Sequence, residues 1–295
     1  MTRRSLLAAP LVLCGQDPVL RVEVQLIRVL ATVRDASNQL VSGLSKEDFS
    51  IGDNGVAQEI AIFERSTTQA LNVAVLLDIS ASVAKDLHYE TGASLRFARA
   101  LIAEGNPEDS IALITFNYAV DLVAGFTRRI KRLDNAVRDI RTGAGTALYD
   151  AVYLAGEELE GREGRKVMIC VTDGGDTVSH TKFGGAMTAA QRAQAAIYAI
   201  LVTPILSGSG RNQGGENALQ LMAERTGGRV LQPTSYEKLG QSFDEILKDL
   251  RTQYVMAYYP KNVPATKNKF HRLEVKSRRS GLRVSARTGY YEETL

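Results

Sequence analysis

The sequence predicts an α/β fold in which a doubly wound, mostly parallel sheet is inserted into a small β-sandwich built from the two terminal segments. Three observations predict it. Two unbroken apolar runs, at residues 73–77 and 167–171, are typical of strands buried on both faces. Strand and helix patterns alternate between residues 71 and 250. The segments on either side of that region alternate apolar and polar residues, as half-buried strands do.

The length and composition fit a soluble globular protein of two domains preceded by a leader. The chain has 295 residues, with 44% hydrophobic and 23% charged residues and a net charge of +3. So small a positive surplus does not indicate nucleic-acid binding. We expect an export signal at residues 1–17, an N-terminal β unit at 18–68, an α/β domain at 69–251 and a C-terminal β unit at 252–295. Each β unit is too short to support a core alone, so we expect the two to pack together.

The first residues resemble an export signal. Arg3 and Arg4 precede a short apolar stretch at residues 6–13, which is too short to span a membrane. The paired arginines resemble a twin-arginine signal, which exports proteins already folded. We therefore expect a periplasmic, envelope-associated or secreted protein without a membrane span. Cys14 stands where a bacterial lipoprotein carries its lipid anchor, but the large Leu13 before it departs from that pattern, so the anchor stays an alternative.

The first β unit begins with alternation along residues 20–33, which changes phase between Leu26 and Ile27. A change of phase suggests a bulge or bend between two strands. Asn54 and Gly55 tolerate the positive φ of a tight hairpin turn, and residues 60–63 close the unit.

The middle region shows further helices and strands. Helical spacing appears at residues 87–101, from Thr146 to residue 159, and at residues 217–226 and 239–250. The last of these helices follows a predicted capping box between Thr234 and Glu237. Strands are predicted at residues 110–116 and 119–124, as an antiparallel pair, and at 197–202 and 228–231. Cys170 lies inside an apolar strand and is expected to be a buried small hydrophobe.

The C-terminal unit is β again, with strands at residues 254–259, 271–275 and 282–286. Its basic residues follow an alternating pattern, which favours the solvated face of a strand over a surface for anionic envelope polymers. They are Lys276, Arg278, Arg279, Arg283 and Arg287.

Two carboxylates follow the two buried strands directly, Asp78 after residues 73–77 and Asp173 after residues 167–171. In a sheet of this type ligands bind at the carboxyl ends of the strands, where the strand order reverses. Ser80, Ser82 and Thr146 could add neutral hydroxyl oxygens there. Carboxylates, hydroxyls and water are the ligands that Mg²⁺ prefers. With the cation bound, the carboxylates of such a site do not fully neutralise its charge. The cation would therefore attract one more carboxylate from outside.

The pattern Asp78-x-Ser80-x-Ser82, then Thr146, then Asp173 resembles the metal-ion-dependent adhesion site of the von Willebrand factor type A family, with all five residues present. The resemblance implies a site for Mg²⁺, with Mn²⁺ or Ca²⁺ as alternatives, that recruits a Glu or Asp of a partner protein. The segments 44–49, 253–260 and 287–290 are similar to those flanking this domain in a bacterial group of related proteins. In the alternative interpretation, these polar residues are only turns and helix caps.

Two further functions remain as alternatives. One is a structural interaction domain of the cell envelope whose cation is static or lost. The other is a magnesium-dependent phosphatase with Asp78 as nucleophile, although Ser80 stands where that chemistry would place a second acid. His88, His180 and His271 are scattered and accompany no nucleophile motif, so we expect no catalytic residues. Gly143 and Gly145 do not form a dinucleotide-binding loop, since no third glycine follows, so no organic cofactor is expected.

Overall fold

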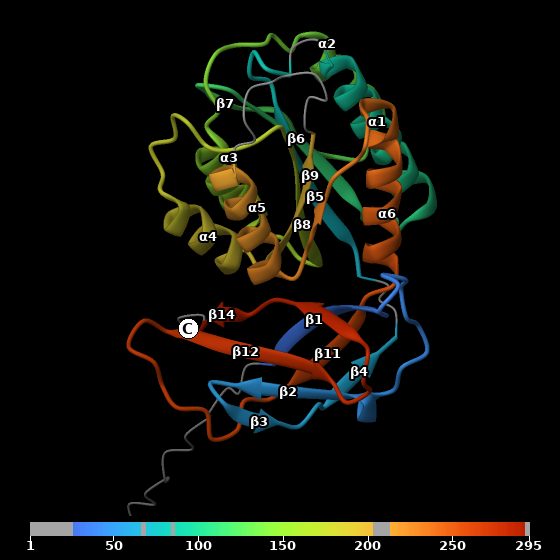
Figure 1. Ribbon diagram of the computed structural model, residues 1–295, viewed down its shortest axis with the longest axis vertical. Coiled ribbons are helices and arrows are strands. Elements are labelled where there is room, and N and C mark those ends of the chain that lie inside the picture. Colours follow the sequence, from blue (N-terminus) through green and yellow to red (C-terminus); the bar gives the residue numbers. More distant parts are fainter. Residues whose placement is uncertain (1–25, 66–68, 84–85, 203–212, 293–295) are drawn as a thin grey trace, which may run out of the picture.

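The computed structural model describes residues 26–65, 69–83, 86–202 and 213–292. An α/β domain stacks on a β-sandwich, and the chain enters and leaves the α/β domain from the sandwich side (Figure 1). The predicted fold class is confirmed. The predicted export signal, Cys14 and the first predicted strand at residues 20–25 lie outside the described residues.

The α/β domain contains a six-stranded sheet with the order β10-β9-β8-β5-β6-β7, in which every neighbouring pair is parallel except β6 and β7. The antiparallel pair was predicted from its short turn. The elements of the domain are β5 (Leu71–Asp78), α1 (Leu87–Glu104), β6 (Ser110–Phe116), β7 (Val120–Thr127), α2 (Ile130–Arg138), α3 (Leu148–Leu159), β8 (Arg165–Thr172), α4 (Phe183–Arg192), β9 (Ala195–Leu201), α5 (Gln213–Thr226), β10 (Val230–Leu231) and α6 (Leu239–Arg251).

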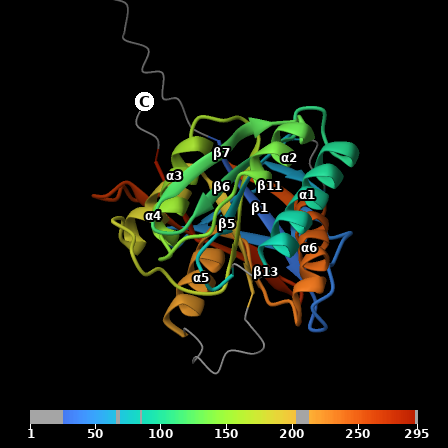
Figure 2. The ribbon, with the colours of Figure 1, turned by 90° about the horizontal axis from the view of Figure 1, so that it is seen from above.

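Helices cover both faces of this sheet. Figure 2 shows α1, α2 and α6 on one side and α3, α4 and α5 on the other. Val73 and Val75 of β5 belong to the core on the first side, and Ala74 and Leu76 to the core on the second. Because both faces of β5 are buried, its sequence is an unbroken apolar run.

Two four-stranded antiparallel sheets form the sandwich, in the orders β13-β1-β11-β4 and β14-β12-β2-β3. In each sheet, strands from before the α/β domain pair with strands from after it, so β1 pairs with β11 and β2 with β12. The strands are β1 (Ile27–Arg34), β2 (Phe49–Asp53), β3 (Val56–Gln58), β4 (Ile62–Glu64), β11 (Tyr254–Tyr258), β12 (Phe270–Ser277), β13 (Arg283–Ala286) and β14 (Gly289–Tyr291), with a 3₁₀ turn at Lys46–Asp48.

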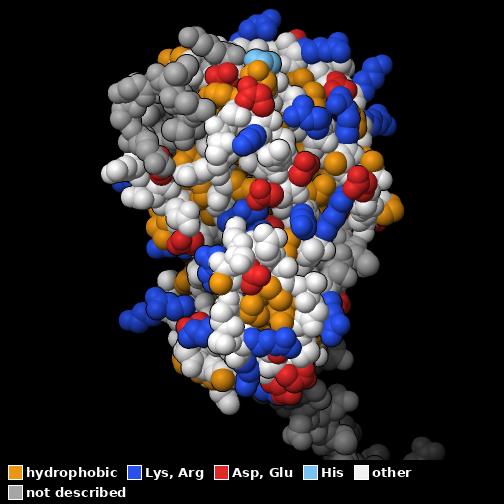
Figure 3. Space-filling model, turned by 45° about the vertical axis from the view of Figure 1, so that its right-hand side comes forward, with side chains coloured by type: hydrophobic (Ala, Val, Ile, Leu, Met, Phe, Trp, Pro, Cys, Tyr) orange, Lys and Arg blue, Asp and Glu red, His pale blue; other side chains and the backbone are white. Residues whose placement is uncertain are grey.

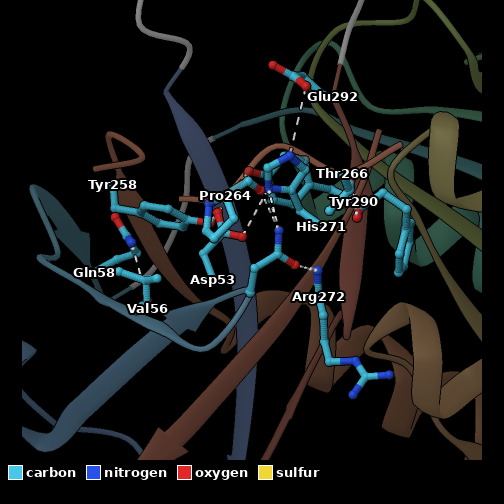
Figure 4. Close-up of polar contacts among 12 residues, drawn as sticks. Asp53, Val56, Gln58, Tyr258, Pro264, Thr266, His271, Arg272, Tyr290 and Glu292 are labelled. Atoms are coloured by element: carbon cyan, nitrogen blue, oxygen red, sulfur yellow. Dashed lines mark hydrogen bonds and ion pairs between the residues drawn. The ribbon is translucent and has the colours of Figure 1, made fainter. Parts of the chain in front are cut away.

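A buried polar cluster links the two terminal segments inside the sandwich (Figure 4). The carboxylate of Asp53 is fully buried and accepts hydrogen bonds from the hydroxyls of Tyr258, at 2.7 Å, and Tyr290, at 2.9 Å. Nδ1 of His271 lies 3.1 Å from the other oxygen of Asp53. Burial raises the pKa of both tyrosines, which therefore remain protonated donors.

The sandwich and the α/β domain also meet through charged groups. Asp249 of α6 is buried and forms ion pairs with Arg34 of β1 and with Arg229, whose Nε lies 2.7 Å from the carboxylate. The amide of Thr288 donates a hydrogen bond of 3.0 Å to the carbonyl of Arg225 at the end of α5. A buried carboxylate is stable only when it is paired, so this junction depends on both arginines.

Four local predictions need correction or extension. Helices α2 and α4 were not predicted. Helix α5 spans Gln213–Thr226 and so extends the helix predicted at residues 217–226 toward the N-terminus. Helix α6 begins at Leu239 after a 3₁₀ turn at Tyr236–Lys238, and neither N-cap, Ser235 or Lys238, makes a capping side-chain hydrogen bond, so the predicted capping box is wrong.

Two other expectations concern single features. Cys170 is fully buried in β8, and burial raises the pKa of its thiol to about 12, as expected for an inert residue. None of the helices in the described ranges combines the length and apolarity needed to cross a membrane.

Replacing Asp53 by Ala should leave two buried tyrosine hydroxyls without their acceptor, at about 1–3 kcal/mol each. We expect the free energy of unfolding to fall by about 3 kcal/mol, measured by urea denaturation followed by circular dichroism. Asp121→Ala, at an exposed position of β7, is the matched control and should change stability by no more than about 0.5 kcal/mol. Equal stability of the two variants would contradict the structural role of the cluster.

Candidate metal centre

The register of two parallel strands places the acidic loops side by side. In the pairing of β5 with β8, Leu77 lies opposite Val171, so Asp78 and Asp173 follow at the same edge of the sheet. Thr172 ends β8 and donates a hydrogen bond of 2.6 Å from its hydroxyl to Oδ2 of Asp78. This edge lies where the strand order reverses, since the chain leaves β5 toward β6 and β7 and returns to β8 on the other side.

Backbone contacts bring the loop that contains Thr146 to the same place. The amide of Gly143 donates a hydrogen bond of 3.0 Å to the carbonyl of Ile79, beside the Asp78 loop. Thr146 exchanges bonds with Thr177, which follows Asp173: its amide donates to the Thr177 hydroxyl at 2.9 Å, and its carbonyl accepts from the Thr177 amide at 2.8 Å. Each of the three loops therefore contacts the other two.

Two glycines permit this close approach. Gly145 has a φ of +77°, a conformation that favours glycine. At Gly143 a Cβ atom would lie 2.5 Å from the side-chain nitrogen of Asn117, so only glycine fits beside that residue. The structure thus gives Gly143 a role in packing against Asn117.

The five predicted ligands differ in exposure. Asp78 is fully buried, Ser80 and Thr146 are buried, Asp173 is partly exposed and Ser82 is exposed. The hydroxyls of Ser80 and Ser82 lie 3.0 Å apart, and the amide of Ser80 donates a 2.9 Å hydrogen bond to Oδ1 of Asp78. The group thus extends from the buried end of β5 to the surface.

The site has an excess of negative charge. Burial raises the pKa of Asp78, the hydrogen bonds from Ser80 and Thr172 oppose that rise, and the neighbouring Asp173 adds to it. Carboxylates and hydroxyls together form a donor set that fits a hard divalent cation.

Glu90, in the first turn of α1, is an acidic residue that the sequence analysis did not select. It is fully buried, and neither of its carboxylate oxygens has a hydrogen-bond partner among the residues that the structure describes. Burial raises its pKa well above 4.5, and Asp78, Asp173 and Asp86 raise it further. Buried carboxylate oxygens are normally hydrogen-bonded. A cation near the Asp78 and Asp173 loops would explain why the two oxygens of Glu90 are not.

A signal for Glu90 was present in the sequence. Ser94, Ala98 and Leu101 follow it at intervals of four, four and three residues, and all three lie on the helix face that was predicted to be buried. An acidic residue on a buried face requires a partner, which could have marked it as a candidate. Thr172 was also missed, because only the strand register brings its hydroxyl to Asp78.

Large apolar side chains are exposed beside the site. Tyr118 and Val178 have exposed fractions of 70% and 43%. Both border Gly145, where an added Cβ would lie 3.1 Å from Val178 and 3.4 Å from the Cβ of Tyr118. Exposed aromatic and aliphatic groups around a polar centre are typical of protein-binding surfaces.

Elsewhere the surface is mixed in charge. On the face in Figure 3, basic and acidic side chains are interspersed, in keeping with a net charge of +3. Among the basic residues predicted to be solvated, Arg279 forms an ion pair with Asp48 and Lys276 with Glu274.

Comparisons with known proteins identify the α/β domain. A family model of the von Willebrand factor type A domain matches residues 72–245, which is more than half of the chain. Comparison with curated proteins gives no match.

Among solved structures, proximal thread matrix protein 1 from the mussel byssus has a TM-score of 0.52 and 19% identity over 68% of this chain and 51% of its own. The vWF domain of the type V pili tip protein Mfa5 from Porphyromonas gingivalis has a TM-score of 0.50 and 14% identity over 62% of this chain and 95% of its own. The hypothetical protein BatB from Bacteroides thetaiotaomicron has a TM-score of 0.47 and 19% identity over 61% of this chain and 100% of its own. At such identities the likenesses to the byssus protein and to Mfa5 show the fold alone.

The raised pKa of Glu90 should make the metal-free protein less stable as pH rises. Below about 4.5 the side chain is protonated in both states, whereas above that value the unfolded chain releases a proton that the folded chain keeps. Stability should therefore fall by up to about 1.4 kcal/mol per pH unit until the raised pKa is passed.

Glu90→Gln should remove this part of the slope and stabilise the metal-free protein at neutral pH. Urea denaturation between pH 4 and 8 in the presence of a chelator measures the effect, and the exposed Glu163→Gln is the control. If Glu90→Gln and the wild type had the same profile, Glu90 would not be the buried acid described here.

Proposed function

Because this chain belongs to the von Willebrand factor type A family, we propose that it is a metal-dependent protein-binding module of the bacterial cell envelope and not an enzyme. Its α/β domain would hold Mg²⁺, with Mn²⁺ or Ca²⁺ as alternatives, through Asp78, Ser80, Ser82, Thr146 and Asp173. The partner would be a protein that presents a Glu or Asp carboxylate.

One observation supports this proposal most strongly. Three separate loops that carry hydroxyl and carboxylate groups meet at one edge of the sheet, and the neighbouring charges that raise the pKa of Asp78 and Glu90 are carboxylates. Such a cluster is electrostatically unfavourable without a cation.

The residues of the chain have distinct roles in this proposal. Thr172 and the amide of Ser80 orient the Asp78 carboxylate, and the Ser80 and Ser82 hydroxyls lie at hydrogen-bond distance from each other. The bound cation would supply a positive centre with a coordination position open to an outside carboxylate. Since Ser82 and Asp173 reach the surface, that position would be open to a partner.

Tyr118 and Val178 would supply the apolar part of the interface. Both stand beside the Thr146 loop, so a partner carboxylate at the cation would bring its neighbouring side chains onto them. Aromatic residues next to a polar anchor commonly carry much of the binding energy in protein interfaces.

Export of the protein is part of the proposal and comes from the basic and apolar pattern of residues 1–17. The structural neighbour Mfa5 is a type V pili tip protein, which is in keeping with a location outside the cytoplasm.

A structural interaction domain is the second candidate, with a static cation and a binding surface on the sandwich. It predicts that partner binding survives loss of the site. The phosphatase alternative is less compatible with an Asp78 that is fully buried and accepts hydrogen bonds on both oxygens.

Added Mg²⁺ or Mn²⁺ should raise the melting temperature of the metal-free protein, because a ligand that binds only the folded state stabilises it by about 2.7 kcal/mol at a hundred times its Kd. Asp78→Ala and Asp173→Ala should both abolish the shift, while Asp121→Ala, on the exposed strand β7, should keep it. Calorimetry of the wild type with no heat at millimolar ion would contradict cation binding.

Partner binding can be tested by capture from a bacterial envelope extract on the immobilised protein, with and without a chelator. We expect captured protein to be lost with the chelator and with Asp173→Ala, and to be reduced about tenfold by Tyr118→Ala, equivalent to about 1.4 kcal/mol. Tyr153→Ala, at an exposed position on α3, is the matched control. Capture that persists in Asp173→Ala would favour the structural domain instead.

A further inference from the structure

A cavity of about 340 Å³ lies between the α/β domain and the sandwich, at the opposite end of the six-stranded sheet from the acidic loops. It lies beside the first residues of β8, whereas Asp173 follows the last residue of that strand. Its lining comes from β1, β8, β11, β14 and the end of α5, so residues of both domains form it. Small-molecule sites occur preferentially at domain interfaces and start at about 300 Å³.

The lining of this cavity is basic. Arg28, Arg165, Lys166 and Arg287 border it, and no acidic residue is among its lining in the ranges that the structure describes. Leu26, Ile27, Val255 and Tyr290 supply an apolar part. These four cationic side chains give the cavity wall a positive potential.

Arg165 is the buried member of this set, with an exposed fraction of 6%. Its Nη1 donates to the carbonyl of Leu250 and, at 3.4 Å, to the side-chain oxygen of Gln253, while its Nε has no hydrogen-bond partner within the described part of the chain. Among the described residues no carboxylate forms an ion pair with it. Burial lowers its pKa to about 10 and the nearby charge of Asp109 opposes that change, so Arg165 remains charged at neutral pH.

Arg287 is held in position on the side of the cavity that the sandwich forms. Its guanidinium donates to the side-chain oxygen of Gln194 at 3.0 Å and to the carbonyl of Arg28 at 2.6 Å. We predicted that Arg287 lies on a solvated strand face, and the contact between the two domains instead makes it part of the cavity wall. Its planar group is therefore fixed for hydrogen bonding to an oxyanion.

Arg165 also borders a second cavity of about 400 Å³, which is less suited to an anion. Glu104 and Asp109 line that second cavity, and their carboxylates would repel a negatively charged ligand. The interdomain cavity is thus the place where the charge of Arg165 can be balanced from outside.

We propose that the interdomain cavity binds a small organic anion, with a carboxylate or phosphate group against Arg165 and Arg287 and an apolar body against Tyr290 and Val255. Such a ligand would contact both domains at once and would stabilise their junction. This binding would be independent of the acidic loops at the other end of the sheet.

Phenyl phosphate and inorganic phosphate are suitable probes, because they share the anion and differ in the apolar body. Binding is measured by isothermal titration calorimetry and by the melting temperature of the full chain, at an ionic strength held constant with sodium chloride. Metal ions are removed beforehand on a chelating resin, since a soluble polycarboxylate chelator could itself enter the cavity.

We expect saturable binding of phenyl phosphate, tighter than that of inorganic phosphate, and a loss of at least about tenfold in affinity in Arg165→Gln. The matched control is Arg138→Gln, at an exposed position on α2, which should bind like the wild type. Should Arg165→Gln fail to fold, Lys166→Glu, which places a carboxylate at the cavity wall, should weaken binding to the same extent. Retention of the Mg²⁺ response in these variants would separate this site from the acidic loops.

Three results would overturn the proposal. One is the absence of saturable heat for either probe with the wild type. Another is equal affinity of Arg165→Gln and Arg138→Gln. The third is equal affinity of Lys166→Glu and the wild type.

Discussion

The register between β5 and β8 is the constraint on which the rest of the molecule depends. Because Leu77 lies opposite Val171, the two strands end together, and the Thr172 hydroxyl reaches the Asp78 carboxylate. A shift by one residue would turn every side chain of the strand to the other face and exchange the two cores. The same pairing therefore sets both the packing of the helices and the position of the acidic loops.

Local patterns in the sequence were sufficient for the fold class and for the loops. Strands β5 and β8 could be predicted because burial on both faces leaves an unbroken apolar run, and β1 because Ile27, Val29, Ala31 and Val33 alternate and are all buried. Each of these patterns lies within a single strand, so it can be recognised without knowing which distant residues the strand contacts. The acidic and hydroxyl residues could be selected because they follow those strands directly.

What could not be predicted depends on tertiary contacts. Helix α2 is an exception, because its apolar residues Ile130, Leu133, Ala136 and Val137 follow helical spacing and pack against the core, so a local signal was present and was overlooked. Helix α4 contains Gly184 and Gly185 and buries mainly alanines; a Cβ on Gly156 of α3 would lie 2.8 Å from the Cβ of Ala189, which shows how closely the two helices pack. The sequence could mark Glu90 as an acid on a buried helix face, but its proximity to Asp78 and Asp173 depends on the fold.

The pairing of β1 with β11 has a consequence for the biogenesis of the protein. On the ribosome, the partner of β1 emerges only after more than 200 further residues, which at 5–20 residues per second is a delay of roughly 10–40 seconds. During that interval the early strands have unpaired edges, and such edges are prone to aggregation. The inserted domain, whose own contacts are complete by α6, can reach its native state first and bring the two halves of the sandwich together as a template. Nascent chains truncated before β11 should accordingly need chaperones that shield hydrophobic strands.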